Sequence, residues 1–303
     1  ILNWGLFGAL SIQVYIYYLS FPKDKLSLKV LVGGVYILEV AQIVLLTQTV
    51  WTLLVSGFGN IAAFDDVGTT WISVPGIGGL VAVIVQCFYS YRIAIFSGSR
   101  IIPGIIVPMS IVSFAGSLSF GVLLKRAGTN TKFFENQSKS AATTLGVSLW
   151  TGTSAACDVL IATCMCYFLH KRKYGMFSRT QALLSKLIRM TIETGTLTAS
   201  IAILTLILFY VRPLKQTNYF GIPLSAEAKL YSTTMLAVLN SRAHIDIHNR
   251  IGATVTFNGV DTAWKENNFG TTEVSRNEIR FNQSLITELD KEEICIGEVQ
   301  IRA

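Results

Sequence analysis

Long apolar runs separated by short polar segments fill the first 240 residues of the chain. About 20 helical residues cross a hydrocarbon core about 30 Å thick, and six runs reach that length. Each is expected to be an α-helix, because unpaired backbone groups cannot face lipid. A seventh, weaker run contains Pro223, Glu227 and Lys229. The predicted spans are residues 1–21, 30–56, 71–96, 101–124, 145–169, 187–211 and 220–240.

Composition supports a membrane location. Of the 303 residues, 51% are hydrophobic and only 14% are charged, whereas soluble domains carry about 25% charged residues. This leaves too little polar surface to cover a soluble core, which excludes a globular cytosolic enzyme. We therefore predict an all-α, multi-pass transmembrane bundle of seven spans, in the lipid bilayer of the plasma membrane or an endomembrane.

The last 63 residues have a different character. Residues 241–303 hold ten acidic and seven basic side chains without a helical period. Residues 254–257 alternate as a strand would, but the low hydrophobicity of the segment favours a largely disordered tail.

The distribution of basic residues predicts the direction of threading. The segments after the first, third and fifth runs, counted with the adjoining ends of the runs, hold eleven Lys and Arg, and the opposite segments hold six. Because cytoplasmic loops are enriched in these residues, we expect an outside N-terminus and a cytoplasmic C-terminus. Asn136 begins a glycosylation sequon, Asn-Gln-Ser, in a segment predicted to lie outside.

Polar side chains inside the apolar runs form the candidate intramembrane site. Ionisable groups are costly in hydrocarbon, so each is first considered as functional. Helical spacing places Gln42 on the face of Glu39 and surrounds Asp158 with small and polar residues, so its carboxylate is expected to face the bundle. The acids can bind a proton, a cation or an amine ligand, or can serve as structural hydrogen-bond partners between helices. The candidates are Asp158, Glu39, Glu193, Gln42 and Gln86.

Two charged side chains have specific structural alternatives. Glu193 lies four residues after Arg189, a spacing that allows an ion pair on one helix. Lys229 is expected to extend outward to water or to pair with Glu227.

No motif for catalysis or cofactor binding is found in the sequence. Nucleotide-binding loops, nucleophile elbows and His clusters at span depth are missing, since His170, His244 and His248 all lie outside the interior of the spans. We therefore expect neither an enzyme nor a cofactor, a metal site or nucleic-acid binding.

Five stretches resemble a family of fungal, mainly basidiomycete, seven-helix membrane proteins that is known as a domain of unknown function. The resemblance covers most of residues 5–242 and implies a receptor-like topology of seven spans. It implies no ligand, activity or site residue. The matching stretches are residues 8–18 (GALSIQVYIYY), 86–92 (QCFYSYR), 157–162 (CDVLIA), 192–200 (IETGTLTAS) and 230–242 (LYSTTMLAVLNSR).

Three functions remain open at this point. The first is a receptor-like or sensory protein that holds a small ligand in the bundle near Asp158 and Glu39, and that contacts a cytosolic protein through residues 171–189 and 241–303. The second is a transporter or channel that uses the same acids for protons or cations. The third is a structural membrane scaffold.

Overall fold

The computed structural model describes residues 1–139, 141–173, 178–210 and 220–241. The chain divides into two units, Ile1–Asn240 and Ser241–Ala303, and the description below concerns the first. The predicted disordered tail lies outside the described residues. Within them the chain is helical and contains no β-strand, so the all-α prediction is confirmed for this part.

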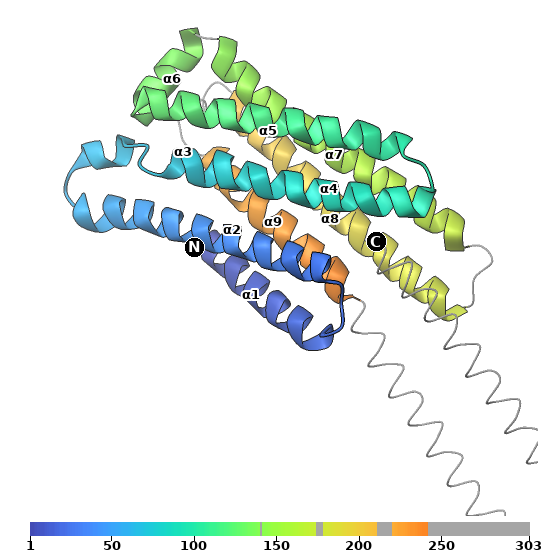
Figure 1. The fold of residues 1–303 in the computed structure, drawn as a ribbon. Helices are drawn as coiled ribbons and strands as arrows, with labels where there is room; N and C mark the ends of the chain where they lie inside the picture. Colours follow the sequence, from blue (N-terminus) through green and yellow to red (C-terminus); the bar gives the residue numbers. More distant parts are fainter. Residues whose placement is uncertain (140, 174–177, 211–219, 242–303) are drawn as a thin grey trace, which may run out of the picture. The chain divides into compact units, whose positions relative to one another are not determined.

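The axes of the long helices are roughly aligned, and the helices form a bundle (Figure 1). The short helix α6 lies at one end of it. The α-helices are α1 (Leu2–Ser20), α2 (Leu26–Trp51), α3 (Thr70–Ile72), α4 (Gly79–Ser97), α5 (Ile101–Ala127), α6 (Asn130–Lys139), α7 (Ala141–Lys173), α8 (Ser178–Tyr210) and α9 (Gly221–Asn240). Two π-helical segments, η1 (Thr52–Ser56) and η3 (Ser73–Gly78), extend α2 and precede α4, and η2 (Ile61–Asp65) is a 3₁₀ helix.

Four of the described helices are long and apolar enough to cross a membrane. They are Leu26–Ser56, Thr70–Ser97, Ile101–Ala127 and Thr144–Lys171, and Gly195–Tyr210 is a shorter apolar helix. These helices point to a membrane-embedded protein, as the sequence predicted. The prediction of seven spans, which also requires α1, α8 and α9 to cross, stays a prediction.

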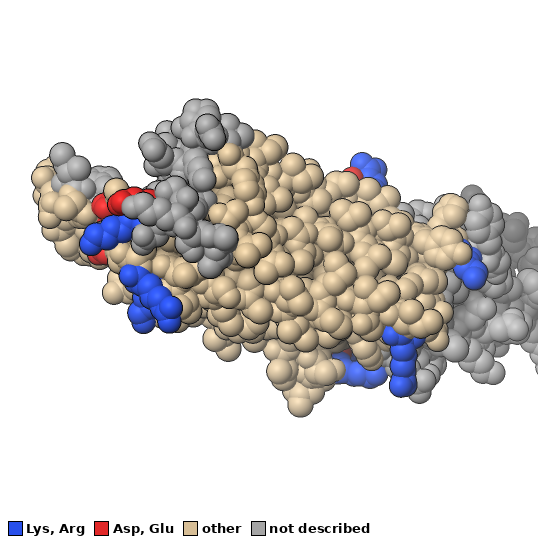
Figure 2. All heavy atoms as spheres, turned by 90° about the horizontal axis from the view of Figure 1, so that it is seen from above, with Lys and Arg blue, Asp and Glu red and all other residues tan. Residues whose placement is uncertain are grey.

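The outward-facing side chains suit lipid better than water. Large aliphatic residues are more than half exposed on separate helices, for example Ile37 on α2, Ile111 on α5 and Ile203 on α8. Soluble monomers rarely expose so much contiguous apolar surface. On the face shown in Figure 2, Lys and Arg lie toward the two ends and the surface between them carries no charge. An uncharged belt with basic ends is the surface expected of a membrane protein.

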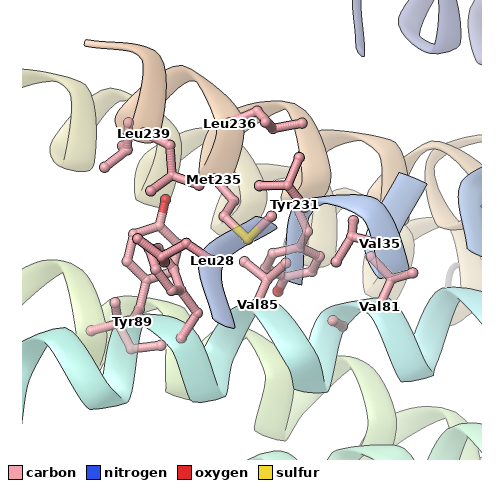
Figure 3. Packing of buried hydrophobic residues seen from close by; sticks show 14 of the residues in the cluster. Leu28, Val35, Val81, Val85, Tyr89, Tyr231, Met235, Leu236 and Leu239 are labelled. Atoms are coloured by element: carbon pink, nitrogen blue, oxygen red, sulfur yellow. The ribbon is translucent and has the colours of Figure 1, made fainter. Parts of the chain in front are cut away.

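Buried apolar side chains from α2, α4 and α9 interlock at the centre of the bundle. Figure 3 shows Val81, Val85 and Tyr89 of α4 facing Tyr231 and Met235 of α9. All five are less than 9% exposed. Helix α9 also packs against α1 and α8, so it touches most of the bundle.

Small residues allow close helix crossings. A Cβ atom added at Gly116 of α5 would lie 2.8 Å from the backbone nitrogen of Trp150 in α7. One added at Gly195 of α8 would lie 2.8 Å from the Cβ of Ala162 in α7. Any side chain larger than hydrogen would separate these helices.

The two segments predicted to lie outside meet at one end of the bundle. The Asp65 carboxylate accepts hydrogen bonds from the backbone amide of Thr131 (2.7 Å) and from its hydroxyl (2.8 Å), and the Val67 amide donates to the Gly128 carbonyl (3.4 Å). The donated bonds from Thr131 hold the pKa of Asp65 below its ordinary value. The contact joins these segments at one end of the bundle, while the side of the membrane stays a prediction.

Candidate functional site

A buried ion pair joins α2 to α9. The ammonium group of Lys229 donates to Glu39 Oε2 at 2.6 Å and to Gln42 Oε1 at 2.8 Å. The Ser232 hydroxyl donates to Glu39 Oε1, and the Gln42 amide donates to the backbone carbonyl of Ser73 at 3.0 Å. The side chains of Glu39 and Lys229 are both fully buried. We call Glu39, Gln42, Lys229 and Ser232 the lysine cluster.

A second polar cluster joins α9 to α4 and α7. The Tyr231 hydroxyl donates to Asp158 Oδ2 at 2.6 Å, and Gln86 Nε2 donates to Asp158 Oδ1 at 3.2 Å. The Ser154 hydroxyl lies 2.9 Å from that of Tyr231. Asp158 is 5% exposed and Gln86 is 1% exposed. We call Gln86, Ser154, Asp158 and Tyr231 the aspartate cluster.

Helical periodicity assembles both clusters. Three- and four-residue spacings place two side chains on one helix face, which pairs Glu39 with Gln42 on α2 and Ser154 with Asp158 on α7. On α9, Lys229 and Ser232 share the face toward α2. Tyr231 lies on the face toward α7. Helix α9 therefore holds both clusters.

The five sequence-predicted side chains do not form one site. The structure places Glu39 with Gln42 and places Asp158 with Gln86, in two separate hydrogen-bonded groups. Glu193 belongs to neither, because its carboxylate is exposed and accepts from Arg189 at 2.9 Å. That is the ion pair considered as its structural alternative.

The expectation for Lys229 is wrong. Lys229 neither extends outward to water nor pairs with Glu227, since its side chain is fully buried against Glu39. A buried ammonium is stabilised only by a close anion and further acceptors, and α2 supplies both. Its partner lies 190 residues away in the sequence, so spacing alone could not reveal it.

Hydrogen-bonded side chains occupy most of the space near Asp158 and Glu39, where a ligand was expected. Beside Asp158 a cavity of about 30 Å³ remains, bordered by α4, α7, α8 and α9. This is room for one water-sized body and not for an organic molecule.

A larger cavity lies at the end of the bundle where the segments around Asp65 and Thr131 meet. Its volume is about 320 Å³, which is within the range of small-molecule sites. Three phenylalanine rings line it and stack edge to face, with ring centres 5.4 Å apart for Phe120–Phe133 and 6.4 Å apart for Phe120–Phe220. Polar side chains reach it from three places, namely Asp66, Thr70 and Asn130. We call this cavity the terminal pocket.

Sequence reasoning did not identify the terminal pocket. Phe120 and Phe220 belong to ordinary apolar runs of the predicted spans, and Asp66 was not singled out. The clustering of Phe residues near the same ends of the runs was the available signal. These residues form a pocket only because α5, α6 and α9 pack together.

Other predicted sites fall partly or wholly outside the description. Asn136 lies in α6, and its side chain is outside the described residues, as are the side chains of 172–188. Among the described residues, no group of three His, Cys, Asp or Glu side chains could hold a metal ion.

Comparison with known proteins yields one match. No curated protein and no solved structure matches the chain. A family model matches residues 154–244, which run from within α7 through α9 and include Asp158, Lys229 and Tyr231. Its description is "Family of unknown function", so it assigns no activity to these residues. Residues 154–244 thus match the model of DUF6534, a family of unknown function.

Proposed function

We propose that the protein is a receptor-like, sensory membrane protein with seven spans, an outside N-terminus and a cytoplasmic C-terminus. In this proposal α1, α8 and α9 cross the membrane together with the four long apolar helices. The terminal pocket then opens toward the outside, and residues 171–189 and 241–303 face cytosolic protein partners.

The observation that carries this proposal is the position of α9. Ile222 and Leu224 in its first turn line the terminal pocket, together with Phe220, which directly precedes α9. About two turns further along, Lys229 and Tyr231 bind α2 and α7. A ligand that moves the start of α9 would strain both polar clusters, and a packed helix passes such a shift along its length.

The lining of the terminal pocket indicates the ligand class. Most of its wall is aromatic or aliphatic, so the body of the ligand is expected to be apolar. The Asp66 carboxylate receives one backbone hydrogen bond, from Gly68 at 3.2 Å, and can accept more. A small, mostly apolar molecule with one hydrogen-bond donor or amine fits this chemistry.

Thermal-shift screening of the purified protein tests the proposal. A ligand of this class should raise the unfolding temperature of the wild type. Val67→Phe, which fills the terminal pocket, should abolish the shift, and Val44→Phe on the exposed side of α2 should preserve it. Equal shifts in both variants would contradict the pocket assignment.

A second function, proton- or cation-coupled transport, is favoured by the buried carboxylates of Glu39 and Asp158. It predicts pH-dependent flux in reconstituted vesicles that Asp158→Asn abolishes. Ligand-induced stabilisation without any flux would favour the receptor.

A further inference from the structure

The small cavity beside Asp158 is lined mainly by oxygen-bearing side chains. Its volume is about 30 Å³. Ile161, Ala162 and Gly195 close one part of it. The remaining lining residues are Gln86, Tyr89, Asp158, Thr198, Tyr231 and Thr234. Most of the cavity wall is carbon, with a few oxygen atoms among it, and there is room for a single small body.

The two polar clusters differ in their charge balance. In the lysine cluster, the ammonium of Lys229 neutralises Glu39 at 2.6 Å. Around the aspartate cluster, Asp158 and Glu227 are both acidic and buried, and no Lys or Arg of the described residues forms an ion pair with either. Arg92, the basic residue further along α4, has its guanidinium 5.7 Å from the ring centre of Phe88. A buried carboxylate without a cation is costly.

Two residues that line the cavity each have a buried polar atom without a hydrogen-bond partner among the described residues, namely the Tyr89 hydroxyl and Gln86 Oε1. The amide nitrogen of Gln86 lies within hydrogen-bond distance of Asp158, Ser154 and Tyr231. Its Oε1 accepts no hydrogen bond within the described structure. An unpaired buried amide oxygen costs free energy that a ligand can recover. The oxygen is an acceptor only, so the missing ligand is a hydrogen-bond donor or a cation.

Hydroxyl oxygens complete a possible coordination shell. The Thr234 hydroxyl donates to the Tyr231 carbonyl at 2.9 Å. The Thr198 hydroxyl lies 3.2 Å from the Gly195 carbonyl and is also hydrogen-bonded to Asp158. A hydroxyl that donates in this way still has lone pairs to offer. Oxygen ligands suit hard cations of the alkali and alkaline-earth groups.

We propose that this cavity binds one monovalent cation of the size of Na⁺. Asp158 supplies the negative charge, Gln86 Oε1 supplies a neutral ligand, and the hydroxyls of Thr198 and Thr234 complete the shell. A single carboxylate in a one-body cavity disfavours Mg²⁺, which keeps several of its waters. The bound cation would neutralise Asp158 as Lys229 neutralises Glu39, and would hold α4, α7, α8 and α9 together. This site is separate from the terminal pocket; it deepens the second proposed function, cation transport through Asp158, and its binding test does not depend on flux.

Thermal unfolding of the purified full chain in detergent tests the site. The probe is Na⁺, titrated as NaCl against choline chloride at constant ionic strength and pH 8. Binding to the folded state should raise the unfolding temperature by about 3 °C and then saturate. K⁺ should act more weakly than Na⁺.

Two threonines of α8 provide a matched pair of variants. Thr198 lines the cavity, whereas Thr205 is equally buried two turns along and donates to the Ile201 carbonyl. In Thr198→Val, the Na⁺ concentration that gives half of the maximal rise in unfolding temperature should increase at least tenfold. Asp158→Asn should abolish the rise, and Thr205→Val should leave it unchanged.

The outcomes decide between a cation and a water. Identical unfolding temperatures in NaCl and choline chloride would overturn the proposal, because a water-filled cavity beside a protonated Asp158 shows no such preference. An equal Na⁺ response in Thr198→Val and Thr205→Val would overturn the location. Should Asp158→Asn fail to fold, the threonine pair still gives the answer.

Discussion

Breaking the Glu39–Lys229 ion pair tests whether the lysine cluster is a fully buried, satisfied network. In Lys229→Met, Glu39 loses its counter-ion and Gln42 Oε1 loses its donor, and both stay fully or almost fully buried. Removal of one partner from a buried pair lowers the free energy of unfolding by about 3–5 kcal/mol. A loss of about 4 kcal/mol lowers the ratio of folded to unfolded protein about a thousandfold. Glu39→Gln should cost a similar amount, because it leaves the ammonium of Lys229 without an anion.

The double variant separates the pair from its surroundings. Glu39→Gln combined with Lys229→Met removes both charges, so it should recover about 2 kcal/mol or more relative to the worse single variant. Reversible unfolding in mixed micelles, followed by tryptophan fluorescence, measures these differences. The exposed pair of Arg189 and Glu193 is the control, and Arg189→Met should leave the unfolding midpoint unchanged. Equal, small effects for Lys229→Met and Arg189→Met would refute a buried ion pair.

Two further predictions concern a helix crossing and the loop contact. Gly116→Ala should destabilise the protein by about 1–3 kcal/mol, because the new Cβ atom would clash with the backbone of Trp150. Gly104→Ala on the same helix is the control: its Cβ atom would have no neighbour within 4 Å, so this variant should be neutral or slightly stabilising. Thermal unfolding of both variants measures the difference. The pKa of Asp65 is lower in the folded state, so its stabilisation is present above the ordinary carboxyl value and is lost as the pH falls through the folded value. The protection factor of the Thr131 amide, its hydrogen exchange relative to the intrinsic rate at the same pH, should therefore fall on acidification in the wild type and should be low at every pH in Asp65→Asn.

Local patterns were sufficient to predict the long helices, whereas α6 lies in a segment between two predicted spans where no helix was expected. The apolar runs predicted elements at 71–96 and 101–124, where the structure has Thr70–Ser97 and Ile101–Ala127. Length and lipid chemistry decide such elements, and both can be read from a run of residues. Helical spacing likewise predicted that Glu39 and Gln42 share a face.

Contacts between distant parts of the chain could not be predicted in this way. Lys229 pairs with a residue on α2, and the choice between that partner and water depends on how α9 packs. The same holds for the terminal pocket, whose walls come from α2, α5, α6 and α9. Periodicity gives the face of a helix, but only packing gives the neighbour of that face.

Glycan mapping of the membrane-bound protein tests the central claim, a chain that crosses the bilayer seven times with its tail in the cytosol. The sequence offers two natural sequons, at Asn136 and at Asn282. With seven spans and an outside N-terminus, endoglycosidase treatment and mass spectrometry should find a sugar at Asn136 and none at Asn282, and Asn136→Gln should abolish it. A sugar at Asn282 would contradict this threading.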